Sequence, residues 1–136
     1  MIKIEDSHAP TLARIHPDLL ILALGSALED GAKAIAEDAA FSIRDGAISG
    51  AGHVPSAPGQ PPNADTHDLD QSIHVGDLIE MPDRIQTAVI ADSDHALYME
   101  LGTSTIAERP FMRPAVERNR RSVIERVAST FGKLLR

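Results

Sequence analysis

The chain has 136 residues, a formal net charge of −7 and no cysteine. This length suits one domain with its own core, and the lack of cysteine excludes disulfides and thiolate chemistry. Aromatic residues make up only 3% of the chain, which predicts an aliphatic core and argues against a large aromatic ligand pocket. No signal peptide is visible, and the apolar run at residues 19–24 is too short to span a membrane. We therefore expect no membrane partner.

Charge is divided unequally along the chain. Residues 1–108 carry 5 Lys/Arg and 18 Asp/Glu, whereas residues 109–136 carry 8 Lys/Arg and 2 Asp/Glu. An acidic body followed by a basic segment favours either a polyanionic partner or complementary contact between copies of the chain.

The first long element is predicted to be a helix over residues 17–45. Pro17 suits a first helical turn, and Asp18 suits the positive end of the helix dipole. Apolar residues recur at helical spacings of four or seven: Leu20, Leu24, Leu28, Ile35 and Ala39. Gly25 and Gly31 weaken a helix but permit close approach of another backbone. They indicate tight packing, either inside the monomer or at an interface.

A loop rich in glycine and proline is predicted over residues 46–66, since this composition fits neither a helix nor a central strand. Long irregular segments in small domains are usually functional or mobile. We interpret the loop as a clamp or arm that becomes ordered on assembly. A Pro-x-x-Pro at residues 55–58 is only a weak signal for a polyproline-binding partner.

Short elements follow the loop. Residues 66–72 predict a turn of helix, with Thr66 as its N-cap, and residues 73–79 an imperfect strand. A turn at residues 81–83 precedes a clean alternating strand over residues 85–91. A short helix is then predicted from His95 to Leu101, with Gly102 as its left-handed cap.

The last helix is predicted over residues 114–136. Its apolar positions follow helical spacing: Val116, Val123, Val127, Phe131 and Leu134. Arginines cover the rest: Arg113, Arg118, Arg120, Arg121 and Arg126. The order of elements predicts a single α+β domain over residues 1–136, in which the long N-terminal and C-terminal helices pack on a small antiparallel β-sheet.

Two segments carry a resemblance. Residues 98–115 read Tyr-Met-Glu-Leu-Gly-Thr and then, after a short gap, Arg-Pro-Phe-Met-Arg-Pro-Ala. Residues 57–62 read Ala-Pro-Gly-Gln-Pro-Pro, followed by Thr-His-Asp-Leu-Asp-Gln-Ser-Ile at residues 66–73. Together these motifs resemble a family of small neck, or tail-completion, proteins of long-tailed bacteriophages. His67 departs from the family pattern, which usually has glycine there, and histidine adopts a positive φ less readily than glycine.

The resemblance implies a structural virion protein of the head–tail neck that is assembled in the host bacterial cytoplasm. It implies a ring of identical copies around the DNA channel, with sixfold symmetry because the tail is sixfold in such phages. The implied neighbours are the head-closure or connector protein and the tail-terminator or tail-tube protein. Genome DNA would pass through the channel without specific binding. The resemblance implies no enzyme activity and no cofactor.

The corner before the last helix is the predicted interaction site. Tyr98 and Leu101 should anchor the short helix to the core, Gly102 should reverse the chain, and hydroxyls should satisfy exposed helix-end groups. A purely structural elbow and a rigid corner that docks a neighbouring copy both fit this pattern. The predicted interface residues are Tyr98, Glu100, Gly102, Thr103, Arg109, Pro110, Phe111, Arg113, Pro114, Pro58, Pro61 and Leu69.

Other functions have weaker signals. The basic residues 113–136 could bind DNA by neutralising phosphates, which is the main alternative, although stacking aromatics are nearly absent. The histidines and acids of residues 65–74 lack the spacing of a metal site. Ser72, His67 and Asp68 do not resemble a nucleophile elbow, and the glycines of residues 46–52 lack the following Lys-Ser/Thr of a phosphate-binding loop.

Overall fold

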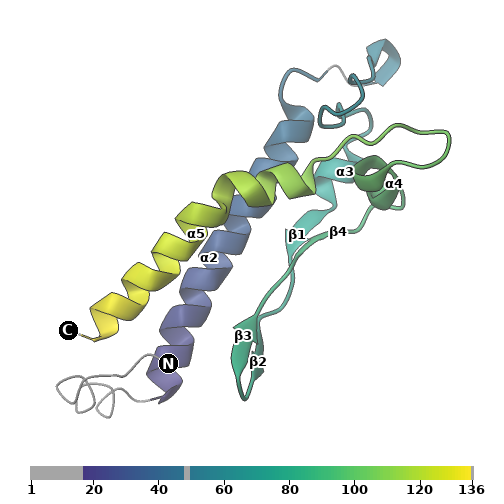
Figure 1. Ribbon diagram of the computed structural model, residues 1–136. Coiled ribbons are helices and arrows are strands. Elements are labelled where there is room, and N and C mark those ends of the chain that lie inside the picture. Colours follow the sequence, from purple (N-terminus) through teal and green to yellow (C-terminus); the bar gives the residue numbers. More distant parts are fainter. Residues whose placement is uncertain (1–16, 48–49, 136) are drawn as a thin grey trace.

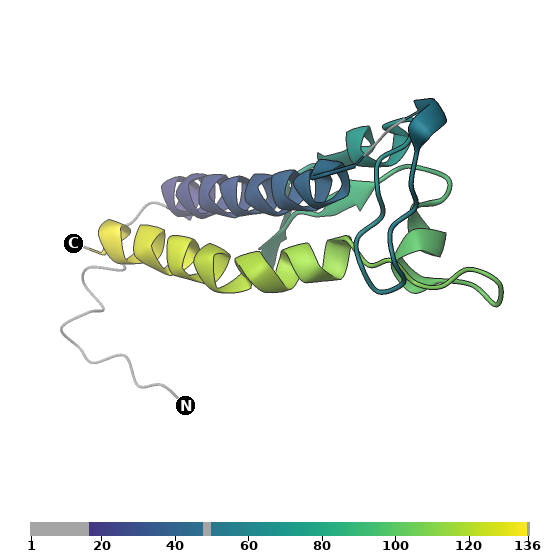
Figure 2. The same cartoon turned by 90° about the horizontal axis from the view of Figure 1, so that it is seen from above.

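Two long antiparallel helices form the body of the protein. The computed structural model describes residues 17–47 and 50–135, so predictions that fall on residues 1–16, 48–49 and 136 lie outside the described part. Helix α2 spans Pro17–Arg44, and helix α5 spans Met112–Leu134 and runs back beside it (Figures 1 and 2). The remaining elements form a small antiparallel β region and two short helices. The predicted α+β class is therefore confirmed.

Glycines bring α2 close to its neighbours. A Cβ atom on Gly31 would lie 2.8 Å from Cγ1 of Val123 on α5, and one on Gly25 would lie 2.7 Å from Cδ2 of Leu78. Both distances are too short for real carbon contacts. Gly31 is needed where Val123 crosses the helix, whereas at Gly25 only the end of the flexible Leu78 side chain would have to shift. Among the described residues, both glycines serve packing inside one chain.

A long, interrupted hairpin forms the β region. Strand β1 (Ile73–Val75) pairs with β4 (Val89–Ala91), and β2 (Ile79–Met81) pairs with β3 (Arg84–Gln86), both antiparallel. The hairpin turns at residues 82–83, within the predicted turn.

The strand predicted over residues 85–91 is interrupted, so that prediction is wrong in its middle. Between the two ladders, residues 76–78 face only residues 87–88. The extra residue makes a β-bulge, which breaks a ladder and increases its twist. The amide of Gly76 donates to the carbonyl of Ala88 at 2.7 Å, and the hydroxyl of Thr87 donates to the carbonyl of Gly76 at 3.1 Å.

The core lies at one end of the helix pair, where α3 (Asp68–Gln71) and α4 (Ala96–Leu101) meet the end of α2 and the start of α5 (Figure 1). Its buried members are mostly small: Ala39, Ile43, Ala64, Leu69, Ala96, Phe111 and Ala115. Phe111 is the largest fully buried side chain. The core is thus mainly aliphatic, as predicted, with Phe111 as its aromatic member among the described residues.

The glycine- and proline-rich loop folds back on the body. It contains one short 3₁₀ turn, η1 (Gly50–Gly52). The amide of Ala64 donates to the carbonyl of Ile43 at 3.0 Å, and the amide of Gly59 donates to the carbonyl of Glu108 at 2.9 Å. These hydrogen bonds form within one chain, which corrects our interpretation of the loop as an arm that requires assembly to become ordered.

Candidate functional site

Glu100 joins α4 to the first turn of α5. Its Oε2 accepts hydrogen bonds from the backbone N–H groups of Phe111 and Met112, and its Oε1 accepts one from Arg113, all at 2.9 Å. The first N–H groups of a helix have no partner within it, and a carboxylate also suits the positive end of the helix dipole. No side-chain cap comes from Phe111 itself. Glu100 therefore caps α5 from the preceding helix.

The cap also sets the ionisation of Glu100. Burial alone would raise the pKa of its carboxyl group, but the hydrogen bonds from the backbone of residues 111–113 and from the Arg113 side chain outweigh burial and lower the pKa below its usual 4.5. Hydrogen bonds to a carboxylate favour its charged form. The side chain is only 14% exposed. Its predicted docking role is corrected, because both oxygens are occupied inside the chain.

Gly102 and Thr103 shape the loop that follows α4. Gly102 ends the helix with φ 72° and ψ 175°, a positive φ that is not the predicted left-handed helical conformation. A Cβ atom there would lie 2.9 Å from the backbone nitrogen of Glu108, so only glycine fits. The hydroxyl oxygen of Thr103 accepts hydrogen bonds from the backbone N–H groups of Thr105 and Ile106. Thr103 therefore stabilises this loop. The prediction that its hydroxyl satisfies groups at the end of α4 is wrong.

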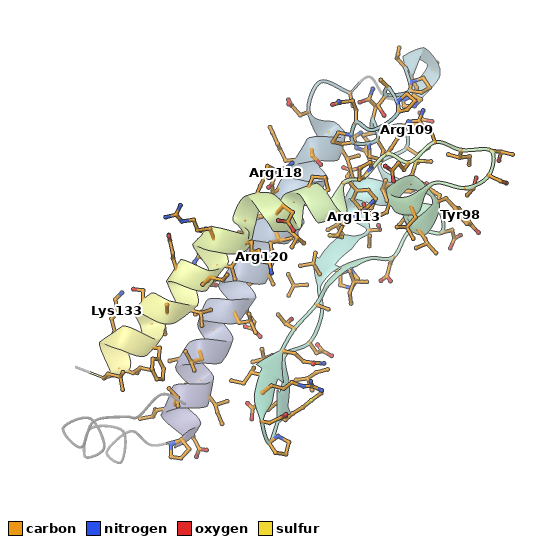
Figure 3. All side chains as sticks on the ribbon, viewed as in Figure 1. Tyr98, Arg109, Arg113, Arg118, Arg120 and Lys133 are labelled. Carbon is orange, nitrogen blue, oxygen red and sulfur yellow. The ribbon has the colours of Figure 1, made fainter. Side chains whose placement is uncertain are left out.

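Arg109 connects this corner to the proline-rich loop (Figure 3). Its Nε donates to the carbonyl of Ser56 at 3.2 Å, and its backbone N–H donates to the carbonyl of Met99. Pro58, which is exposed, and Pro61, which is half-buried, belong to the same loop. The backbone N–H of Gly59 also donates to the carbonyl of Glu108, so the segments at residues 57–73 and 98–115 are in direct contact although residues 74–97 separate them in the sequence.

Arg113 lies on the outside of the corner (Figure 3). Its Nε is 3.4 Å from Oε1 of Glu100, and its Nη2 is 3.5 Å from Oε2 of Glu108. The Arg113 side chain remains 62% exposed. Exposed ion pairs of this kind contribute little to stability and can exchange partners. Arg113 is therefore able to meet an acidic group from outside the chain.

Several predicted interface residues are internal. Phe111 is 1% exposed and Leu69 is 6% exposed, so neither can present its side chain to a partner. Both were predicted as interface residues because the motifs could not distinguish a residue that shapes a corner from one that contacts a neighbour. Pro110 and Pro114 are half-buried. Pro114 falls in the first turn of α5, where its missing N–H costs no helical hydrogen bond.

An apolar surface covers the outer side of α4 and the loop after it. Leu97 is 64% exposed, Tyr98 51%, Leu101 58% and Ile106 38%. We call these four residues the apolar knob. The prediction that Tyr98 and Leu101 anchor α4 in the core is wrong, because Ala96 and Met99 take the inward positions. Leu97 and Ile106 were missed, since α4 carries apolar residues on both faces and spacing alone cannot tell the faces apart.

Most arginines of α5 are paired within the chain. Arg118 forms two hydrogen bonds with the carboxylate of Asp38 on α2, both at 3.0 Å. The hydrogen bond from Arg118 is the main reason why the pKa of Asp38 is lowered from 3.8. Arg120 and Arg121 lie near acids of their own helix, Glu117 at 3.7 Å and Glu125 at 2.9 Å. Part of the basic charge predicted to meet a polyanion or another copy is therefore paired inside the chain, since Asp38 binds Arg118.

The histidine and acid cluster has its own internal contacts. Asp70 is buried, and its Oδ2 lies 3.2 Å from Nδ1 of His67 and 3.8 Å from Nε of Arg44. The hydroxyl of Ser72 donates to the carbonyl of Leu69 at 2.7 Å. Within residues 17–47 and 50–135, no group of three or more His, Cys, Asp or Glu side chains is placed to hold a metal ion.

Comparison with family models, with curated proteins and with solved structures found no match to this chain. Among the helices of the described residues, none is long and apolar enough to cross a membrane.

Proposed function

We propose that this protein is a structural component of the neck of a long-tailed bacteriophage, where it completes the tail or joins head and tail. Identical copies form a ring around the DNA channel, between the head-closure or connector protein and the tail-terminator or tail-tube protein. Two motifs, at residues 57–73 and 98–115, support this function by their resemblance to such neck proteins.

The apolar knob is the observation that carries the proposal. Four large apolar side chains are exposed together beside a corner that Glu100, Gly102 and Arg109 hold in shape. Contiguous exposed apolar surface on a small protein marks a site of contact with another protein. A rigid corner is useful to an assembly because a surface that is already ordered loses less entropy on binding. This supports a structural role over a catalytic one.

The acidic character of residues 1–108 has a use in a ring. Phosphate groups of the passing genome are repelled by acidic surface, so a channel lined by carboxylates keeps DNA from adhering. The DNA-binding alternative has less support, because Arg118 is bonded to Asp38 and both Arg120 and Arg121 lie beside acids of α5. A binding titration with duplex DNA separates the two, and the neck proposal expects no salt-dependent binding.

Deletion of the coding gene from its phage genome tests the proposed function. We expect electron micrographs to show filled heads and separate tails, with normal particles restored by the wild-type gene. A Tyr98→Asp, Leu101→Asp double variant should fail to restore them, because it places two charges on the apolar knob. Ser122→Asp, at an exposed position of α5, is the matched control and should restore them. Infectious tailed particles from the deletion would refute the proposal.

A further inference from the structure

An apolar groove lies at the far end of the molecule from the knob. It runs between the N-terminal half of α2 and the tip of the β2–β3 hairpin and has a volume of about 690 Å³. Its apolar lining includes Leu20, Leu24, Leu28, Met81, Ile85 and Val127. All six side chains are half-buried, so each offers apolar surface that residues 17–47 and 50–135 leave uncovered. The groove is large enough to receive several apolar side chains.

The knob of a chain cannot reach the groove of the same chain. α4 lies beside the core, whereas the groove lies near the start of α2 and the hairpin tip, at the opposite end of the molecule (Figure 1). If two knobs met around a twofold axis, both grooves would stay empty. A head-to-tail contact covers a knob and a groove at every junction, and such contacts close into a ring when the rotation between copies allows it.

Charges beside the two surfaces are complementary. Glu80 and Asp83 lie on the groove rim, both exposed, together with Arg84. The knob is flanked by Arg109 and by the exposed Arg113, the latter near Glu108. Opposite charges around an apolar centre favour one register and orientation over others. The acidic rim therefore fits the arginine side of the corner better than it fits a second copy of itself.

We propose that the apolar knob of one copy inserts into the groove of the next copy, with Arg113 of the first beside Glu80 and Asp83 of the second. This contact deepens the proposed ring function, on which it rests, by assigning both surfaces that neighbouring copies share. The contact is small, so it is stable when copies are concentrated or held on a template and weak in dilute solution.

Single-cysteine variants test the contact, because the chain has no cysteine of its own. Leu101→Cys places a thiol on the knob, Leu24→Cys places one in the groove, and Ser122→Cys is the exposed control on α5. Purified variants, checked for folding by circular dichroism, are mixed at millimolar concentration and mildly oxidised. We expect on the order of tenfold more disulfide-linked heterodimer from Leu101→Cys with Leu24→Cys than from Leu101→Cys with Ser122→Cys.

The outcomes are separable. More homodimer from Leu101→Cys alone than heterodimer from the mixture would mean that knobs meet each other, and it would overturn the proposal. Equal cross-linking in the mixture and the control pair would also overturn it. Because the readout is a covalent bond in purified protein, it does not depend on the neck function. Separate heads and tails after gene deletion, without the specific cross-link, would keep the ring function and reject this contact.

Discussion

At the scale of single residues, Glu100 explains the spacing inside the second motif. Its carboxylate accepts the first backbone N–H groups of α5 from a position 11 to 13 residues earlier in the chain. The segment between Gly102 and Arg109 must therefore leave α4, turn and return. A helix start that is fixed by a distant residue gives the corner a defined geometry.

Replacement of Glu100 by glutamine should destabilise the fold. Glu100→Gln removes the charge and one of two acceptor oxygens, so we expect a loss of about 1–3 kcal/mol in the free energy of unfolding. Urea denaturation measures this loss. Glu117→Gln is the control. Glu117 is exposed and its ion pair with Arg120 is long, at 3.7 Å, so this substitution should change the free energy of unfolding by no more than about 0.5 kcal/mol. Equal effects of the two substitutions would rule out the cap.

Stability should fall in acid through Glu100 and Asp38. The folded state lowers the carboxyl pKa of both residues below 4.5 and 3.8, respectively. The unfolded chain then binds protons more readily, so these groups stabilise the fold fully above their unfolded pKa values, and the stabilisation is lost as pH drops through the lower folded values. Unfolding free energies at pH 7, 5, 4 and 3 should show a smaller decline for Glu100→Gln, Asp38→Asn than for the wild type.

His67 occupies a position that favours glycine. Its φ is 67° and its ψ is 10°, in the left-handed region, where the resembling family usually has glycine. His67→Gly and His67→Ala both remove the ring contact with Asp70, but only glycine relieves the backbone cost. We expect the glycine variant to be more stable than the alanine variant by about 1 kcal/mol. Ser122, inside α5, is the control: Ser122→Ala should be more stable than Ser122→Gly, because alanine is the better helix former.

At the scale of elements, Gly31 fixes the distance between α2 and α5. A Cβ atom there would lie 2.8 Å from Cγ1 of Val123. Gly31→Ala should therefore destabilise the fold by about 1–3 kcal/mol, although alanine favours helix. Val123→Ala in the same chain should recover part of the loss, which thermal denaturation of the double-mutant cycle measures. Gly132→Ala is the control, with no neighbour within 4 Å, and should be neutral or stabilising.

Periodicity predicted the elements better than it predicted their contacts. The first helix spans Pro17–Arg44 and ends one residue before its predicted end. Both bounds could be predicted closely because Pro17 and the glycine-rich region after the helix are local signals. The bulge beside Gly76, the cap from Glu100 and the outward face of α4 were not predicted. Each depends on residues far apart in the chain or on which of two apolar faces the core covers. Local patterns contain no such information.

At the scale of the whole molecule, apolar surface is exposed at both ends. The knob lies beside α4, and the groove lies near the start of α2 and the hairpin tip. Within the chain, the Asp38–Arg118 pair joins the acidic part to the basic helix, so the charge division seen in the sequence is partly neutralised internally. The knob and the groove remain exposed at opposite ends, and a head-to-tail ring needs two such different surfaces on every copy.

Localisation in the assembled particle is the most direct test of the proposed neck function. Phage particles carrying a short peptide tag after Arg136 would be labelled with gold-conjugated antibody and imaged by electron microscopy. We expect the label at the junction of head and tail, and none along the tail tube or over the capsid. Label confined to the capsid or the tail tip, or tagged protein that is absent from purified infectious particles, would contradict the proposal.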